Sequence, residues 1–194
     1  MRCRKIFFAA IISLFLLVSF GFGEEYSLQY FLAKGSSKAN ELSKKEKMEL
    51  LNQIEEVLGQ ATQIHTKLIQ NIQTGEMDIR YQEGKFWISK MEEDKDSIET
   101  GIQQIKLLKD KPTHLVPSIK LYKSLKDLSS NFNAYNNIPS FSALVGDLAP
   151  EMELWADSVF YKLYLLPLAQ LKDKEVKKET PQQEKKPTPK AKKP

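Results

Sequence analysis

The chain has 194 residues, with 29 Lys and Arg against 25 Asp and Glu, a formal net charge of +4 and one cysteine. That length is enough for one domain with a hydrophobic core of its own. A single cysteine excludes a disulfide framework within the chain, an iron–sulfur centre and a thiolate zinc site. With eight glycines and no glycine-rich phosphate loop, the sequence also argues against nucleotide binding.

The first 23 residues have the form of a secretory signal peptide. Three basic residues within the first five positions are followed by an uncharged, mostly apolar run over residues 6–20. Gly21 and Gly23 then place small side chains three positions and one position before the expected cleavage point, a pattern typical of signal peptidase substrates. A membrane-spanning helix needs about 20 apolar residues, and the run over residues 6–20 is shorter than that. We therefore expect residues 1–23 to be cleaved. The protein would then be periplasmic or secreted; an uncleaved membrane anchor is the alternative.

The C-terminal end is rich in lysine and proline. Residues 172–194 carry nine lysines and four acidic residues, and they hold four of the nine prolines. Such a segment cannot bury enough apolar surface to offset the entropy of ordering it. We therefore expect a disordered tail over residues 175–194. The tail is either a solubilising spacer or a tether to an anionic envelope polymer. The tether hypothesis rests on five lysines: Lys185, Lys186, Lys190, Lys192 and Lys193.

The positive charge belongs to the two ends of the chain. The signal contributes three positive charges and residues 172–194 a net charge of +5, so residues 24–171 carry a net charge of −4. An acidic body lacks the basic patch that nucleic-acid binding needs. The sequence therefore predicts no nucleic-acid partner. Residues 24–42 form an N-terminal segment ahead of the helical body.

Two long helices are predicted in the first half of the body. Ser43 and Glu46 form a capping box and Gly75 provides a C-terminal stop. We expect one helix over residues 43–73 and a second over residues 79–109. Each has seam residues at alternating spacings of three and four, the pattern of a coiled-coil seam. Two matched helices joined by a short turn favour a helical hairpin. The predicted seams are Leu50, Ile54, Val57, Ala61, Ile64 and Leu68 in the first helix, and Tyr81, Gly84, Ile88, Met91, Lys95, Ile98, Ile102 and Ile105 in the second.

Two further helices follow. A third is predicted over residues 117–135, a short helical turn over residues 140–146, and a fourth from about residue 147 to about residue 174, with a kink at Pro167. Because the sequence shows no strand pattern, we expect an all-α fold. Residues 43–174 are predicted to form an antiparallel up-down-up-down four-helix bundle built on the long hairpin. The apolar stripe of the third helix is Leu121, Leu125, Leu128, Phe132 and Tyr135.

The fourth helix has more apolar surface than a bundle core needs. At about 100° per residue, its apolar side chains fall on two opposite faces. Either the chain covers the second face itself, through residues 28–32 or residues 141–145, or this face docks a protein partner or a second copy of the chain. The core face consists of Met152, Trp155, Val159, Leu163 and Leu166. The second face, the hypothetical partner-binding surface, consists of Leu154, Tyr161, Tyr164, Leu165 and Leu168.

The polar residues do not form a recognisable catalytic or metal-binding motif. His65 and His114 belong to no metal-ligand pair, and no nucleophile–base pair has specific support. The acidic run from Glu92 to Glu99 lacks the loop spacing of a calcium site and is interpreted as a solvated face, with Lys95 as a polar interruption of the seam. We therefore expect no enzyme activity, no cofactor and no metal. A haem held by His65 and a methionine is the weaker alternative.

These observations favour a non-enzymatic interaction or adaptor protein of the cell envelope. It would dock a protein partner, or itself as a homodimer, through the fourth helix, and the basic tail would act as a flexible tether. The alternative is a periplasmic carrier that holds an apolar small molecule in the bundle interior, where Trp87, Trp155 and Phe132 would line the ligand.

Overall fold

The structure is a computed structural model that describes residues 26–37 and 41–179. The predicted signal peptide and the five tail lysines lie outside the described residues. Within the described ranges the fold is all-helical and contains no β-strand, which confirms the predicted fold class at that level. The helices, in chain order, are α2 (Leu28–Gly35), α3 (Lys44–Thr74), α4 (Tyr81–Asp110), α5 (Leu115–Asn136), α6 (Pro139–Val145), α7 (Leu148–Glu153), η1 (Leu154–Leu165) and α8 (Leu166–Glu179).

The ends of α3 follow the predicted local chemistry. The Ser43 side chain accepts a hydrogen bond from the Glu46 N–H, and the Glu46 carboxylate accepts one from the Ser43 N–H, which completes the capping box. At the other end Gly75 has φ = 74°, a left-handed conformation that glycine adopts without a steric penalty. The remaining predicted helices also exist, with boundaries within about two residues of the prediction except at the end of the fourth helix. There α8 continues to Glu179, beyond the predicted end near residue 174 and into the first five residues of the predicted disordered tail.

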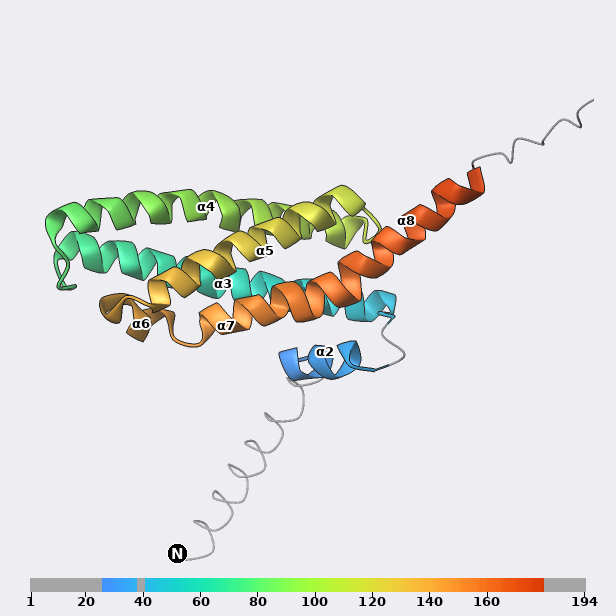
Figure 1. Ribbon diagram of the computed structural model, residues 1–194, viewed down its shortest axis with the longest axis horizontal. Helices are drawn as coiled ribbons and strands as arrows, with labels where there is room; N and C mark the ends of the chain where they lie inside the picture. The colour runs from blue at the N-terminus through green and yellow to red at the C-terminus, as the bar shows by residue number, and fades with distance from the viewer. Residues whose placement is uncertain (1–25, 38–40, 180–194) are drawn as a thin grey trace, which may run out of the picture.

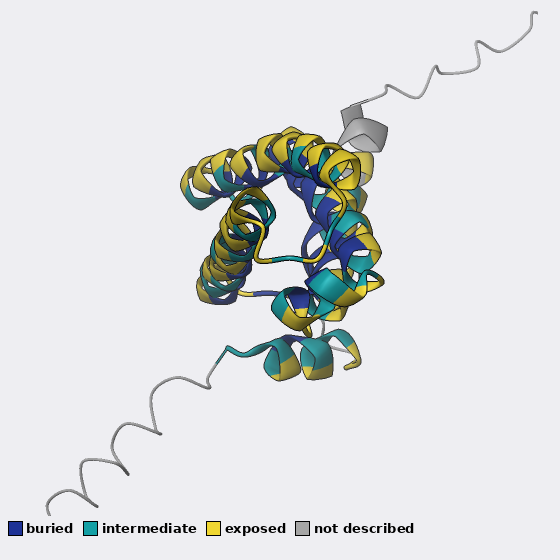
Figure 2. Cartoon of the chain, turned by 90° about the vertical axis from the view of Figure 1, so that its left-hand side faces the viewer, coloured by how far each residue is buried: buried dark blue, intermediate teal, exposed yellow. Residues whose placement is uncertain are grey.

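Helices α3, α4 and α5 and the continuous helix formed by α7, η1 and α8 lie side by side along the long axis of the molecule (Figure 1). α4 packs against both α3 and α5, and α5 packs in turn against α7 and η1. The short α6 follows α5 and packs against it, while α2 lies against η1 (Figure 1). Figure 2 shows that the buried residues face the inside of this arrangement and that the exposed residues face outward.

The core follows the predicted stripes most closely in α3 and α5. All five predicted stripe residues of α5, from Leu121 to Tyr135, are buried, and so are five of the six predicted for α3. The sixth, Ile64, is half-buried beside the buried His65. Burial of large apolar side chains at a spacing of three and four residues accounts for why these segments are helical and why each packs against α4.

The prediction of which residues of α4 face the core is wrong in part. Tyr81 is 76% exposed and Lys95 is exposed, whereas Asp94 is buried at 1% exposure. The solvated acidic face predicted around residues 92–99 therefore does not include Asp94. Two physical features fix the observed phase. Asn131 and Tyr135 donate hydrogen bonds to the Asp94 carboxylate and offset the cost of its burial. The residues that are buried are Gly84, Met91, Asp94, Ile98, Gly101, Gln104, Ile105 and Leu108.

Gly101 is the second feature that fixes the phase of α4. A Cβ atom added at Gly101 would lie 2.9 Å from Leu58 Cδ1 on α3 and 3.6 Å from Ser124 Cβ on α5. The absence of a side chain thus lets three helices approach one another closely at this position. A prediction of the buried face that counts only large apolar residues does not identify such a position.

The fourth predicted helix is one continuous helix with a change of winding. α7 and α8 are α-helical, whereas η1 is π-helical, with hydrogen bonds between residues five apart. At its end the Leu166 N–H donates to the Tyr161 carbonyl, just before Pro167, which has no N–H to donate. A π-helical turn contains more residues than the 3.6 of an α-helix, so each residue advances by less than 100°. Side chains after η1 therefore face differently from the predicted directions.

Leu166 shows the consequence of this winding. It was predicted to belong to the core face but is 39% exposed, while Leu165 and Leu168, predicted to lie on the second face, are buried. The prediction assumed a uniform α-helical advance, and that assumption is wrong over η1. None of the helices among the described residues is long and apolar enough to cross a membrane.

Candidate partner-binding cleft

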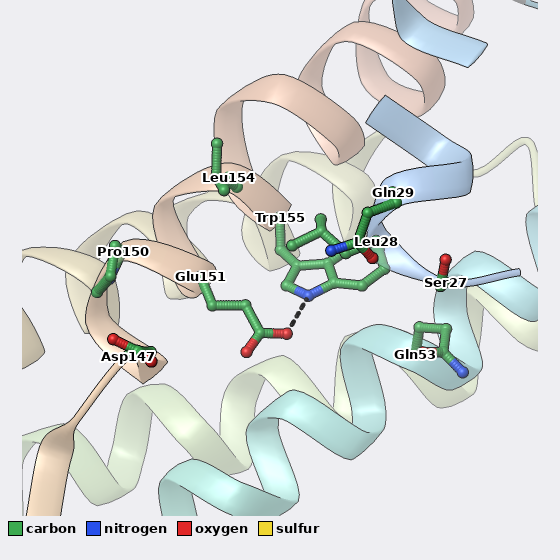
Figure 3. Close-up of a pocket in the computed structure, with 9 residues that line it drawn as sticks. All are labelled: Ser27, Leu28, Gln29, Gln53, Asp147, Pro150, Glu151, Leu154 and Trp155. Carbon is green, nitrogen blue, oxygen red and sulfur yellow. Dashed lines mark hydrogen bonds between the residues drawn. The ribbon is translucent and has the colours of Figure 1, made fainter. Parts of the chain in front are cut away.

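A cleft of about 500 Å³ lies between α2, α3 and the start of the fourth helix (Figure 3). This volume is within the range of sites that hold small molecules or protein side chains. Three segments far apart in the sequence line it: the start of α2, α3 at Gln53, and the region from Asp147 to Trp155. Its lining residues are Ser27, Leu28, Gln29, Gln53, Asp147, Pro150, Glu151, Leu154 and Trp155.

The indole of Trp155 is held in place from two sides. Its N–H donates a hydrogen bond to the Glu151 carboxylate at 3.1 Å, one helical turn earlier. Its ring meets the ring of Phe31 from α2 in an edge-to-face contact, with centroids 6.0 Å apart. Trp155 is 1% exposed and Phe31 is fully buried. The cleft therefore has a rigid aromatic wall whose orientation depends on α2.

The polar character of the cleft is acidic. Asp147 and Glu151 contribute two carboxylates, and no lysine, arginine or histidine is among the residues that line it. Leu154, 39% exposed, adds an apolar edge next to them. Such a surface suits a segment that presents an apolar side chain together with a basic one, because the apolar group can pack on Leu154 while the cation approaches the carboxylates.

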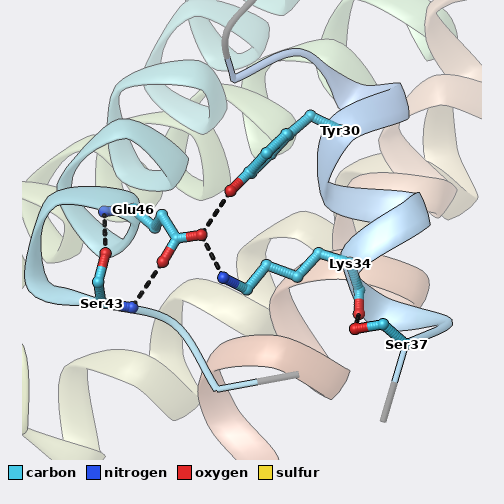
Figure 4. A network of polar contacts seen from close by, with 5 residues as sticks. All are labelled: Tyr30, Lys34, Ser37, Ser43 and Glu46. Carbon is cyan, nitrogen blue, oxygen red and sulfur yellow. Dashed lines mark hydrogen bonds and ion pairs between the residues drawn. The ribbon is translucent and has the colours of Figure 1, made fainter. Parts of the chain in front are cut away.

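A single carboxylate holds α2 against the start of α3 (Figure 4). Glu46 accepts hydrogen bonds from the Tyr30 hydroxyl at 2.5 Å and from the Lys34 ammonium, in addition to the capping bond from Ser43. Burial by itself would raise the pKa of Glu46. The hydrogen bonds from Lys34, Tyr30 and Ser43 outweigh it and lower the pKa from 4.5 to about 2. α2, and with it one wall of the cleft, is thus held by an ionised group at neutral pH.

The five residues of the predicted partner-binding face are not brought together on one exposed surface. Leu154 and Tyr161 are 39% and 40% exposed, whereas Tyr164, Leu165 and Leu168 are buried within the chain. α2 packs on η1, but its contacts reach residues predicted on the core face: a Cβ atom added at Gly35 would lie 3.8 Å from Leu163, and Phe31 meets Trp155.

Tyr164 is covered by a different part of the chain. Its hydroxyl donates to the Pro112 carbonyl at 2.9 Å, in the connection between α4 and α5, and its ring stacks on Phe160. Burial raises the pKa of the Tyr164 hydroxyl above its ordinary value. Tyr161 lies at the border with α5, where its ring is 5.4 Å from that of Tyr122. Of the predicted face, Leu154 and Tyr161 remain the residues that a partner can reach.

Sequence reasoning missed most of the cleft. It used Asp147 and Pro150 only as the start of a helix and took Leu28 as a possible cover. The spacing of Glu151 and Trp155 by four residues, which places the carboxylate next to the indole N–H, is a signal in the sequence that could have indicated one wall. The contribution of Gln53 and α2 depends on tertiary packing and has no local signal.

Elsewhere in the described ranges, no group of three or more His, Cys, Asp and Glu side chains is arranged to hold a metal ion. His65, proposed as a haem ligand in the weaker alternative, is buried and donates its Nε2–H to the Met91 carbonyl. The three aromatic residues predicted to line an interior ligand contact other rings instead: Trp87 meets Tyr135 and Phe132 meets the same tyrosine, while Trp155 meets Phe31.

No protein-family model matches the chain, and no curated protein and no solved structure is significantly similar to it.

Proposed function

We propose that this protein is a non-enzymatic adaptor that binds a protein partner through the cleft between α2 and the fourth helix. The observation that carries the proposal is the combination of an exposed apolar edge at Leu154 with two carboxylates, Asp147 and Glu151, in a cleft of about 500 Å³. The partner segment would present an apolar side chain next to a lysine or arginine. Tyr161 would extend the contact along the helix.

We further propose that α3, α4, α5 and the fourth helix form an antiparallel up-down-up-down four-helix bundle. Two contacts between α3 and α4 support this arrangement. Lys109 pairs with Glu55 at 2.5 Å, and a Cβ atom added at Gly84 would lie 3.0 Å from Ile72 Cγ2. Late residues of α3 thus meet early residues of α4, and earlier residues of α3 meet the end of α4, as expected for a hairpin.

The proposal includes an extracytoplasmic location, periplasmic or secreted, with removal of residues 1–23. The basic start, the apolar run and the small residues before Glu24 support it. The lysines between Lys185 and Lys193 would then tether the acidic body to an anionic envelope polymer.

Site-specific photo-crosslinking tests the adaptor function. A photoreactive amino acid at position 154 should give a discrete crosslinked protein in cells that produce the chain. The same group at position 171, which is more exposed than position 154 but lies on α8 outside the cleft, should not. Combining Asp147→Asn with Glu151→Gln should abolish the crosslink, because both negative charges proposed to attract the partner's cation are removed. The Trp155 indole should keep its orientation, since the glutamine oxygen can still accept a hydrogen bond from the Trp155 N–H. A product with the mass of two chains would identify a second copy as the partner. Equal crosslinking from both positions, or none from position 154, would refute the proposed site.

A further inference from the structure

A second surface feature lies at the far end of the helical hairpin, away from the cleft. Figure 2 looks onto this end of the molecule, where α3 ends and α4 begins. The last residues of α3, the connecting turn and the first two turns of α4 line a groove of about 520 Å³. We call it the hairpin-end groove. Its large apolar and charged lining residues are Ile72, Ile79, Arg80, Tyr81, Lys85 and Ile88.

The walls of the hairpin-end groove are mainly apolar. Ile72, Ile79 and Ile88 are half-buried and line the groove, and Ile72 and Ile79 also pack on the core. Gly84 is buried among them, and an added Cβ there would lie 3.0 Å from Ile72 Cγ2. The missing side chain at Gly84 therefore keeps α3 and α4 close at the base of the groove. Tyr81, 76% exposed, is a large side chain at its rim.

Two cations are the charged residues of this groove. Arg80 and Lys85 line it, and no carboxylate is among the lining residues, although Glu76, Asp78 and Glu83 are close in sequence. Throughout the described part of the chain, neither cation has a carboxylate within ion-pair distance. The Lys85 ammonium lies 4.6 Å from the centroid of the Tyr81 ring instead.

A groove with apolar walls and two unpaired cations is complementary to one chemical class. The apolar part of the ligand gains from leaving water against the isoleucines, and its anionic end gains from two positive charges that pair with no carboxylate among the described residues. We propose that the hairpin-end groove binds a single-chain anionic amphiphile, a fatty-acid anion, with the acyl chain along Ile72, Ile79 and Ile88 and the carboxylate between Arg80 and Lys85. This site is separate from the proposed adaptor cleft, and neither depends on the other.

Isothermal titration of the full chain with dodecanoate, kept below its critical micelle concentration, tests the site. Dodecanoate should bind with one site per chain and at least about tenfold more tightly than dodecylammonium, which has the same chain length and the opposite charge. Acetate, which has the carboxylate without the chain, should not bind measurably. Equal affinity for the anionic and cationic chains would overturn the proposal.

Variants separate the two contributions to binding. Arg80→Gln combined with Lys85→Gln, both at exposed positions, should lower dodecanoate affinity at least about tenfold and remove the preference for the anion. Ile79→Ser should lower affinity while keeping that preference. Lys106→Gln, an exposed cation on α4 outside the groove, is the matched control and should bind as the unaltered chain does.

Three results would refute the assignment. The first is undiminished dodecanoate binding by the double glutamine variant, and the second is an equal loss of binding in the Lys106→Gln control. The third is binding to anionic phosphatidylglycerol vesicles without binding to monomeric dodecanoate, since the hairpin end would then be a membrane-contacting surface rather than a site for a free amphiphile.

Discussion

Glu46 offers the sharpest test of how α2 is attached. In Glu46→Gln the side chain stays nearly the same size and can still accept from the Ser43 N–H, as glutamine does in capping boxes, but its charge is lost. The fall of the Glu46 pKa from 4.5 to about 2 in the folded chain corresponds to about 3 kcal/mol at neutral pH, since a tenfold change in the ionisation constant is worth about 1.36 kcal/mol. Because the capping bond is retained, we expect the substitution to cost about 2 kcal/mol.

The stability difference between the unaltered chain and Glu46→Gln should depend on pH. A carboxylate whose pKa is lowered on folding contributes stability that is complete above about pH 4.5 and is lost as the pH falls toward 2. The difference between the unaltered chain and Glu46→Gln should therefore be largest at neutral pH and shrink to about 1 kcal/mol or less at pH 2.5.

Two measurements check the prediction. Urea unfolding gives the global free energy, and hydrogen exchange of the amides of residues 28–35 reports whether α2 opens separately from the rest of the fold. Glu56→Gln, an exposed carboxylate on the same helix, is the control and should leave both unchanged. If Glu46→Gln matched this control, or if its deficit persisted at pH 2.5, the electrostatic attachment of α2 through Glu46 would be refuted.

Two further predictions concern the packing of α4. Burial raises the pKa of Asp94 above its ordinary 3.8 despite its hydrogen bonds, so protonation of Asp94 contributes stability as the pH falls, opposite in sign to Glu46. The stability of the unaltered chain relative to Asp94→Asn should therefore rise on acidification from neutral pH to about 3.8, measured by urea unfolding of both proteins at the two pH values. Gly101→Ala should destabilise the fold by about 1–3 kcal/mol because the new methyl group would meet the buried Leu58. Gly59→Ala, at a helical position with open space, should instead stabilise it by about 1 kcal/mol, and the same response in both alanine variants would contradict the packing argument.

The helical content and the long helices α3 and α5 were predictable because their signals are local. A capping box at Ser43, a left-handed glycine at position 75 and a continuous apolar stripe from Leu121 to Tyr135 each act within a few residues. Nothing in those segments required knowledge of what they pack against.

The errors arise where local periodicity allows two answers. In α4 the spacings of both Asp94 and Lys95 fit between Met91 and Ile98, and hydrophobicity alone cannot choose between a carboxylate and an ammonium at the seam. Asn131, on α5, settles the choice by donating to Asp94. In the fourth helix the change to π-helical winding has no counterpart in a calculation that advances every residue by about 100°.

The candidate cleft could be anticipated only in part for the same reason. Leu154 was identified as an apolar residue away from the core, and it is exposed at the edge of the cleft. The other walls come from α2 and from Gln53, which lie about 100 residues away in the sequence and are placed by tertiary contacts alone.

The contact between α2 and η1 also sets an order for biosynthesis. Phe31 leaves the ribosome early, but Trp155, the ring it packs against, follows about 120 residues later. At typical elongation rates of about 5–20 residues per second, α2 waits about 6–24 s for its packing surface. During that interval Phe31 has no Trp155 to pack on, while α3 and α4 can already pair. Among the described helices, α2 is therefore made first, and its aromatic contact with Trp155 forms long after its hydrogen bond from Tyr30 to Glu46 on α3 becomes possible.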